Sequence, residues 1–157
     1  MQKVTPFLWF DGNAEEAARF YVSVFRDAKI KGIMHYTEAG PKPKGLVLTV
    51  TLELFGQDYV FLNGGPQYTF TPALSFMVTC KDQEELDSYW NKLADGGKPI
   101  RCGWITDKFG VTWQITPSIL MGMIQDKDSA RAARVTRAMM GMVKLDIAAL
   151  KAAYNGE

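Results

Sequence analysis

The chain has 157 residues, of which 47% are hydrophobic and 12% aromatic. These values are typical of a folded globular protein and exclude a disordered chain, and the length is sufficient for a domain with a buried core. The formal net charge of +1 is spread along the sequence without a basic block, which argues against nucleic acid as a partner.

The expected compartment follows from the cysteines and from the first residues. Cys80 and Cys102 match neither a zinc-binding nor a disulfide-framework spacing. The N-terminal residues contain no secretory signal pattern, and no apolar run is long enough to span a membrane. We therefore expect a cytoplasmic protein with two reduced thiols.

The first half of the chain predicts a strand, a helix and three more strands. The apolar run at 7–10 precedes Asn13, which we expect to cap a helix whose apolar stripe ends near Phe25. The Gly- and Pro-rich segment 39–45 predicts a loop, and its part 41–45 is either a lid or a plain surface loop. The three strands are expected at about 29–36, 46–55 and 58–63.

The same order of elements returns about 69 residues later. A strand at 74–78 leads to Asp82, which is expected to cap a second helix that ends at Gly96-Gly97. A short extended piece follows at about 99–102. The segment 103–115 then reads as a hairpin, and we expect Asp107 to hold its Asp-Lys-Phe-Gly turn as an Asx turn.

The C-terminal part reads as helical and amphipathic, so it must pack either on its own domain or on a second subunit. We predict one α+β domain over residues 1–157, with two tandem β-α-β-β-β modules and a helical tail. The first module is expected at 4–63, the second at 73–116 and the C-terminal helices at 118–155.

Two such modules in tandem resemble the vicinal oxygen chelate superfamily of glyoxalases, bleomycin-resistance proteins and dioxygenases. The residues are most similar to its PhnB-like branch, often labelled 3-demethylubiquinone-9 3-methyltransferase. The matching segments are Pro6-Phe7-Leu8-Trp9-Phe10, Ala14-Glu15-Glu16-Ala17, Phe20-Tyr21, Gly103-Trp104, Asp107–Ile115 and Leu145–Leu150. The resemblance implies that the two modules curl a mixed sheet around a shared cleft, and that the protein is a homodimer.

Metal-dependent members of this superfamily draw His and Glu ligands from the first and last strand of each module. Here the windows Val4-Thr5-Pro6 and Ala73-Leu74-Ser75 offer neither type, and the first module ends with Asn63. Gln114 stands where the metal-binding Glu is expected. Neutral amides bind transition metals poorly, so we expect no metal at these positions. An alternative site would have to recruit His35 and Glu53.

The residues expected to bind a ligand are Trp9, Asn63, Trp104 and Gln114. Small-molecule pockets combine apolar walls with a few placed polar groups, which tryptophan and neutral amides supply. Because side chains alternate along a strand, Trp113 should face the helices if Gln114 faces the cleft.

Other candidates have structural explanations. Cys102 lacks an adjacent histidine to act as a base, which argues against a nucleophilic role. The pairs Glu15-Glu16 and Glu84-Glu85 suit the first turns of helices. The glycines at 12, 64–65 and 96–97 are not expected in the strand-loop-helix context that binds S-adenosylmethionine.

The leading hypothesis is a small-molecule-binding protein with a cleft that needs no metal and no cofactor, whose precise activity is not specified. The alternatives are a metal-dependent glyoxalase-like lyase or dioxygenase, and a methyltransferase as the family label suggests.

Overall fold

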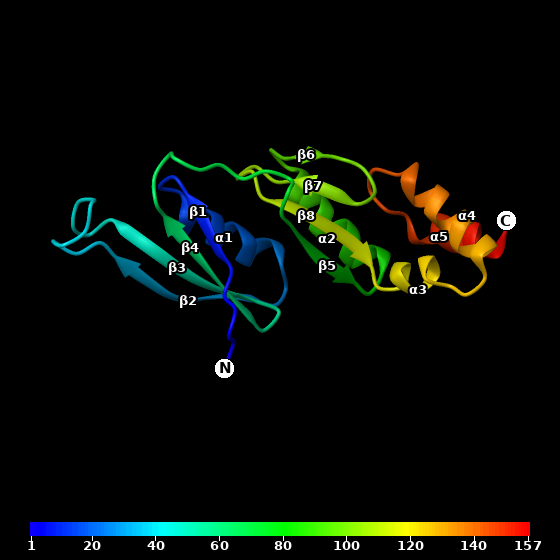
Figure 1. The fold of residues 1–157 in the computed structure, drawn as a ribbon, viewed down its shortest axis with the longest axis horizontal. Helices are drawn as coiled ribbons and strands as arrows, with labels where there is room; N and C mark the ends of the chain where they lie inside the picture. The colour runs from blue at the N-terminus through cyan, green and yellow to red at the C-terminus, as the bar shows by residue number, and fades with distance from the viewer. The chain divides into compact units, whose positions relative to one another are not determined.

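The computed structural model describes all of residues 1–157 and divides the chain into two compact units, Met1–Phe70 (unit 1) and Thr71–Glu157 (unit 2). Each unit contains one β-α-β-β-β module with its own four-stranded mixed sheet (Figure 1). The α+β class and the repeated module predicted from the sequence are confirmed. No helix combines the length and the apolar character that crossing a membrane requires.

Unit 1 arranges its strands in the order β1-β4-β3-β2, with β1 parallel to β4 and the other pairs antiparallel. Its elements are β1 (Phe7–Phe10), α1 (Ala14–Val24), β2 (Ala28–His35), β3 (Val47–Leu54) and β4 (Gln57–Asn63). Helix α1 covers one face of this sheet, where Tyr21 packs edge-on against Phe61 of β4. The other face carries every second residue of each strand, because side chains alternate.

The start of α1 differs from the expectation. Asn13 occupies the N-cap position, but its side chain makes no capping hydrogen bond. Asn63, at the end of β4, takes that role instead, and its Oδ1 accepts a hydrogen bond from Ala14 N at 2.9 Å. A long-range bond therefore replaces the local cap that the sequence predicts.

Unit 2 repeats the arrangement in the order β5-β8-β7-β6. Its module consists of β5 (Ser75–Cys80), α2 (Gln83–Ala94), β6 (Lys98–Pro99), β7 (Trp104–Thr106) and β8 (Thr112–Pro117). Here the predicted cap is confirmed: Asp82 accepts a hydrogen bond from Glu85 N, and the Glu85 carboxylate accepts one from Lys81 N. This reciprocal pattern resembles a capping box. The extended piece expected at 99–102 stops early, because Cys102 and Gly103 both adopt left-handed conformations.

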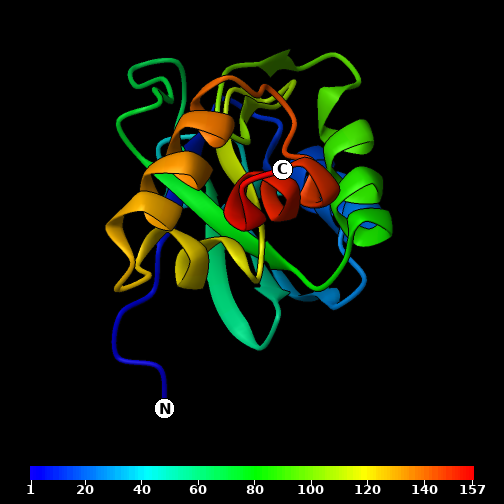
Figure 2. The same ribbon diagram turned by 90° about the vertical axis from the view of Figure 1, so that its right-hand side faces the viewer.

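The helical tail packs within unit 2 and consists of α3 (Leu120–Ile124), α4 (Ser129–Met140) and α5 (Ile147–Asn155). Helices α4 and α5 lie side by side (Figure 2). The segment that joins them is bound to the module, because Cys102 N donates to Met142 O and Gly103 N donates to Val143 O. Leu145 is fully buried against Gly103, where an added Cβ would lie 2.9 Å from Leu145 Cδ1.

Candidate functional site

The open face of the unit 1 sheet borders a cavity whose size and lining suit a small molecule. One row of cross-strand neighbours crosses all four strands on this face, consisting of Trp9, Leu62, Thr49 and Met34. A cavity of about 520 Å³ lies against it. Its lining is Trp9, Met34, His35, Tyr36, Thr37, Gly40, Pro41, Leu48, Leu62 and Gly64.

Trp9 is fixed against the backbone that follows β4. Its Nε1 donates a hydrogen bond to Gly65 O at 2.8 Å, and its ring meets the edge of the Tyr68 ring at a centroid distance of 5.0 Å. Gly64 permits this packing, because an added Cβ there would lie 2.2 Å from Trp9 Cζ2. The indole is therefore a preorganised wall of the cavity.

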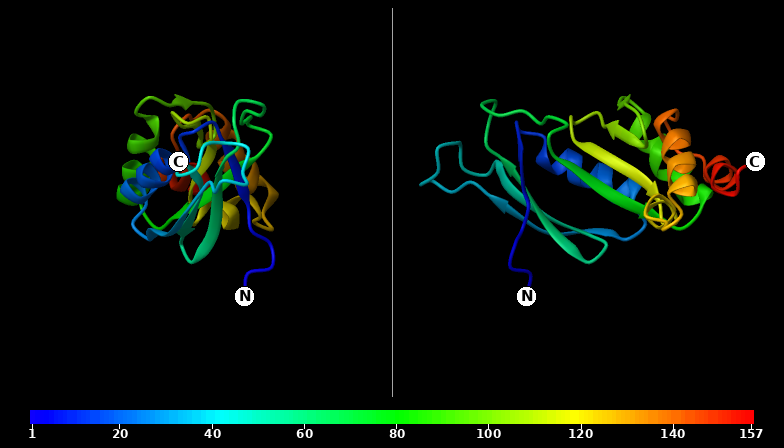
Figure 3. Two further views of the ribbon diagram at one scale, coloured as in Figure 1. Left: turned by 90° about the vertical axis from the view of Figure 1, so that its left-hand side faces the viewer. Right: turned by 45° about the vertical axis from the view of Figure 1, so that its right-hand side comes forward.

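The loop between β2 and β3 completes the cavity and projects past the ends of these strands (Figure 3). Its base is closed by backbone hydrogen bonds from Tyr36 N to Leu46 O and from Gly45 N to Tyr36 O. An ion pair of 2.9 Å joins Lys44 to Glu38 across it. The expected loop is thus present as a hydrogen-bonded structure, and its action as a lid stays a prediction.

Asn63 lies on the face of the sheet that packs against α1, opposite to the face of Trp9. It is only 6% exposed, and its amide Nδ2 donates to Val47 O at 3.1 Å while its Oδ1 serves α1. Tyr36 is also buried, and its hydroxyl donates to Asn63 O at 2.7 Å. Both residues line a second, smaller cavity of about 260 Å³. Binding of a ligand by Asn63 stays a prediction, and the contacts give it a structural role as well.

The two site residues predicted in unit 2 lie side by side on the open face of the second sheet. Trp104 of β7 is the cross-strand partner of Gln114 of β8. Gln114 Nε2 donates a hydrogen bond to Ser75 Oγ at 2.9 Å, and both residues are half-buried. Their role as ligand contacts stays a prediction.

Trp113 points to the opposite face, as the alternation predicts, and is buried beside Phe76. Its Nε1 donates to Asp107 Oδ2 at 2.8 Å, while Asp107 Oδ1 accepts from Phe109 N and Val111 N. Asp107 is thus confirmed as the residue that holds the turn. Its buried carboxylate acts as a structural acceptor for three donors.

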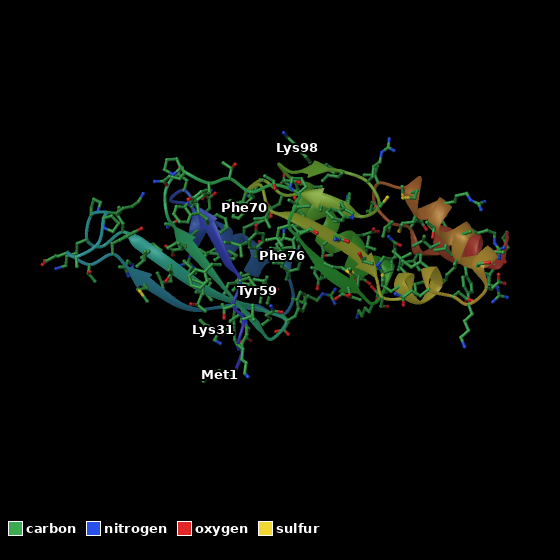
Figure 4. The ribbon with its side chains drawn as sticks, in the orientation of Figure 1. Met1, Lys31, Tyr59, Phe70, Phe76 and Lys98 are labelled. Atoms are coloured by element: carbon green, nitrogen blue, oxygen red, sulfur yellow. The ribbon has the colours of Figure 1, made fainter.

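The chain offers no cluster of metal ligands, since no three His, Cys, Asp or Glu residues lie close enough to hold an ion. The alternative pair is also not brought together. His35 is exposed at the end of β2, whereas Glu53 pairs with Lys29 and Lys31 near the other end. Lys31, labelled in Figure 4, also contacts the Asp58 carboxylate, and this hydrogen bond raises the pKa of Lys31.

S-adenosylmethionine, which the family label implies, does not fit the glycines of this chain. Contrary to the expectation, Gly12 does lie between a strand and the helix that follows it, β1 and α1. It is a single glycine, and the Ala14 N–H at the start of that helix is already bound by Asn63. The common binding mode needs a glycine-rich loop with free backbone donors, which this turn does not provide.

The two cysteines have different environments. Cys80 is fully buried, and this burial raises the pKa of its thiol to about 12. Cys102 is half-buried, and its Sγ lies 3.7 Å from Met140 Sδ rather than beside a general base. These contacts give both thiols a structural explanation.

Sequence reasoning singled out the loop that contains Gly40 and Pro41, but not Tyr36 or Gly64, as part of the larger cavity. Gly64-Gly65-Pro66 reads as a linker, and only the packed position of Trp9 shows why a glycine is needed there. Tyr36 lies at the end of an expected strand and carries no pattern that separates it from a core residue.

Comparison with known proteins places the chain among its relatives. It matches the family model described as 3-demethylubiquinone-9 3-methyltransferase over residues 2–116. The PhnB protein from Bacillus cereus, whose structure carries the same family name, is 40% identical with a TM-score of 0.68, over 74% of this chain and 100% of that one. No protein of curated function matches the chain.

More distant structures are similar in fold. Protein PA1353 from Pseudomonas aeruginosa is 21% identical with a TM-score of 0.59, over 72% of this chain and 95% of that one. A glyoxylase/bleomycin resistance protein/dioxygenase domain from Frankia sp. EAN1pec is 15% identical with a TM-score of 0.47, over 72% and 94%. This last likeness is too distant to add to the assignment.

The match over residues 2–116, the Bacillus cereus relative and the repeated β-α-β-β-β module confirm the resemblance drawn from the sequence. This chain belongs to the 3-demethylubiquinone-9 3-methyltransferase family and is PhnB-like.

Proposed function

We propose that this chain binds a small organic molecule with an apolar body in the unit 1 cavity beside Trp9. The observation that carries the proposal is the immobilised indole, which forms one wall of a largely apolar space of about 520 Å³. Sites for small molecules are concave, mostly apolar and largely preformed, with volumes of roughly 300–1,000 Å³. The cavity therefore has the size and the lining of a binding site.

Two further parts of the hypothesis extend this proposal. Trp104 and Gln114 lie on the open face of the unit 2 sheet, and we propose that they contact the same class of ligand. We also propose that the protein acts as a cytoplasmic homodimer. The metal-dependent alternative gains no support from the side chains, because the donors that a catalytic metal prefers are not gathered at any point. The methyltransferase alternative gains none from the turn at Gly12, where the Ala14 N–H is already bound by Asn63.

The binding proposal is tested with phenyl-naphthylamine, a neutral aromatic probe whose fluorescence rises in apolar surroundings. We expect saturable binding to the wild-type protein and an affinity at least about tenfold lower for Trp9→Ala, because the variant removes a large apolar contact surface. The matched control is Phe7→Ala, two residues away on the same strand, since Phe7 is 63% exposed and does not line the cavity. Equal affinities of the two variants would contradict the proposal.

A further inference from the structure

Lys42 is unusual among the cationic residues of this chain. Of the 18 Lys and Arg residues, only Lys42, Arg134 and Lys144 are half-buried, and all others are exposed. Arg134 donates to the carbonyl oxygens of Ala153 and Tyr154, and Lys144 pairs with Asp87 at 2.9 Å. Lys42 has no hydrogen bond and no ion pair.

The burial of Lys42 belongs to its side chain as a whole, and no side-chain nitrogen or oxygen of the protein is buried without a hydrogen-bond partner. Its ammonium group therefore remains accessible while the rest of the side chain packs against the protein. A cation that lines a cavity without a protein partner is available to pair with an anion that enters the cavity.

The surroundings of Lys42 place its ammonium group beside the proposed binding site. Lys42 lines the smaller cavity of about 260 Å³, whereas its neighbour Pro41 lines the larger one. A Cβ added to Gly65 would lie 3.6 Å from Lys42 Nζ, and Gly65 O is the acceptor of the Trp9 indole. The cation therefore lies next to the peptide group that fixes the cavity wall.

The nearby charges do not cancel that of Lys42. Glu15 lines the same small cavity, but its carboxylate is paired with Arg19, whose Nη2 lies 2.6 Å from Glu15 Oε1. Glu38, on the same loop, pairs with Lys44. The loop backbone is held by Pro41, Pro43 and its closing hydrogen bonds, so the backbone from which Lys42 extends is preorganised.

We infer that the ligand carries one anionic oxygen group, which Lys42 binds, in addition to the apolar body that the cavity beside Trp9 accepts. This inference rests on the proposed function and specifies its ligand class. An oxyanion at this position would form a charge-assisted hydrogen bond with the ammonium group. The lysine would thereby select anionic over neutral molecules of the same shape.

The test compares two probes that share one skeleton, neutral phenyl-naphthylamine and anilinonaphthalene sulfonate. We expect the wild-type protein to bind the sulfonate more tightly, and Lys42→Met to lower the sulfonate affinity about tenfold while the neutral probe is unaffected. The matched control is Lys44→Met, which removes an exposed, paired lysine from the same loop and should change neither affinity.

The outcomes distinguish failure of the anion inference from failure of the proposed function. Binding of the neutral probe with no preference for the sulfonate, or a sulfonate affinity that Lys42→Met leaves unchanged, would overturn the inference and leave the proposed function standing. Binding of neither probe would overturn both. Inorganic phosphate carries charge without an apolar body and should not displace the sulfonate at equal concentration, so displacement by phosphate would contradict the ligand class inferred here.

Discussion

Substitution of Gly64 by alanine tests whether the indole of Trp9 is held as the wall of a preformed cavity. An added Cβ would lie 2.2 Å from Trp9 Cζ2 and 2.4 Å from Cε2 and Cη2, far inside van der Waals contact. The ring must move, which breaks its 2.8 Å hydrogen bond to Gly65 O and its edge contact with Tyr68. Overpacking of this kind costs about 1–3 kcal/mol, and the lost hydrogen bond adds about 1 kcal/mol.

We therefore expect Gly64→Ala to lower the free energy of unfolding by about 2–4 kcal/mol and to weaken phenyl-naphthylamine binding. Urea unfolding followed by circular dichroism measures the first effect, and probe titration measures the second. The control is Gly32→Ala in the same sheet, where an added Cβ meets nothing within 4 Å. If both variants unfold at the same urea concentration and bind the probe equally, the assignment of Trp9 as the cavity wall is refuted.

Four further results are expected. Asp107→Asn should lower the free energy of unfolding by about 2–3 kcal/mol, because an amide NH₂ would face the Trp113 indole donor. The control Asp82→Asn should be nearly neutral, since asparagine caps helices well. Equal urea midpoints of the two variants would contradict this prediction. Leu145→Ala should cost about 2–5 kcal/mol and speed up thiol labelling of Cys102, which the docked segment contacts, and an unchanged labelling rate would argue against this docking. Burial raises the pKa of the Cys80 thiol to about 12 in the folded chain, against 9.0 for an unperturbed thiol. The free energy of unfolding should therefore fall between these two pH values by up to about 1.4 kcal/mol per pH unit. In a pH series of urea titrations, Cys80→Ala should show a shallower decline. Elemental analysis of the purified protein should find no stoichiometric transition metal, and one tightly bound equivalent would favour the metal-dependent alternative.

The repeated module was predictable because both copies carry strong local signals. The strand, the cap and the helix of the second copy follow from Asp82 and from the apolar stripe behind it. The first copy shows where local signals fail, because the Asn13 side chain is not used and Asn63 binds the helix start from a distant strand. Sequence spacing alone does not show that a residue from a distant strand takes the place of the local cap.

The two copies differ by one residue in the loop between their first strand and their helix. The loop between strand and helix spans three residues in the first module, 11–13, and two in the second, 81–82. The offset of about 69 residues aligns the two helices, but it leaves the two strands out of register by one residue. Because side chains alternate along a strand, this alignment matches strand residues that lie on opposite faces of their sheets. Which residues face the cavity was therefore not readable from the repeat.

The site was only partly predictable for a similar reason. Trp9 follows from its place on the first strand, but its partners are a glycine and a loop that are distant in sequence. Neither Gly64 nor Lys42 carries a motif, and both matter only because the packed chain brings them to the cavity. Asn63 was predicted for its amide group, and the structure adds the two backbone partners that this amide already has.

The central claim is that the cavity beside Trp9 binds a small organic molecule, and the indole resonances test it most directly. The chain has four tryptophans, so nitrogen–proton NMR should show four indole signals, with Trp9→Phe identifying the signal of Trp9. On titration with phenyl-naphthylamine, we predict a saturable shift of the Trp9 signal while that of the buried Trp113 stays in place. An unchanged Trp9 signal at saturating probe would contradict the account.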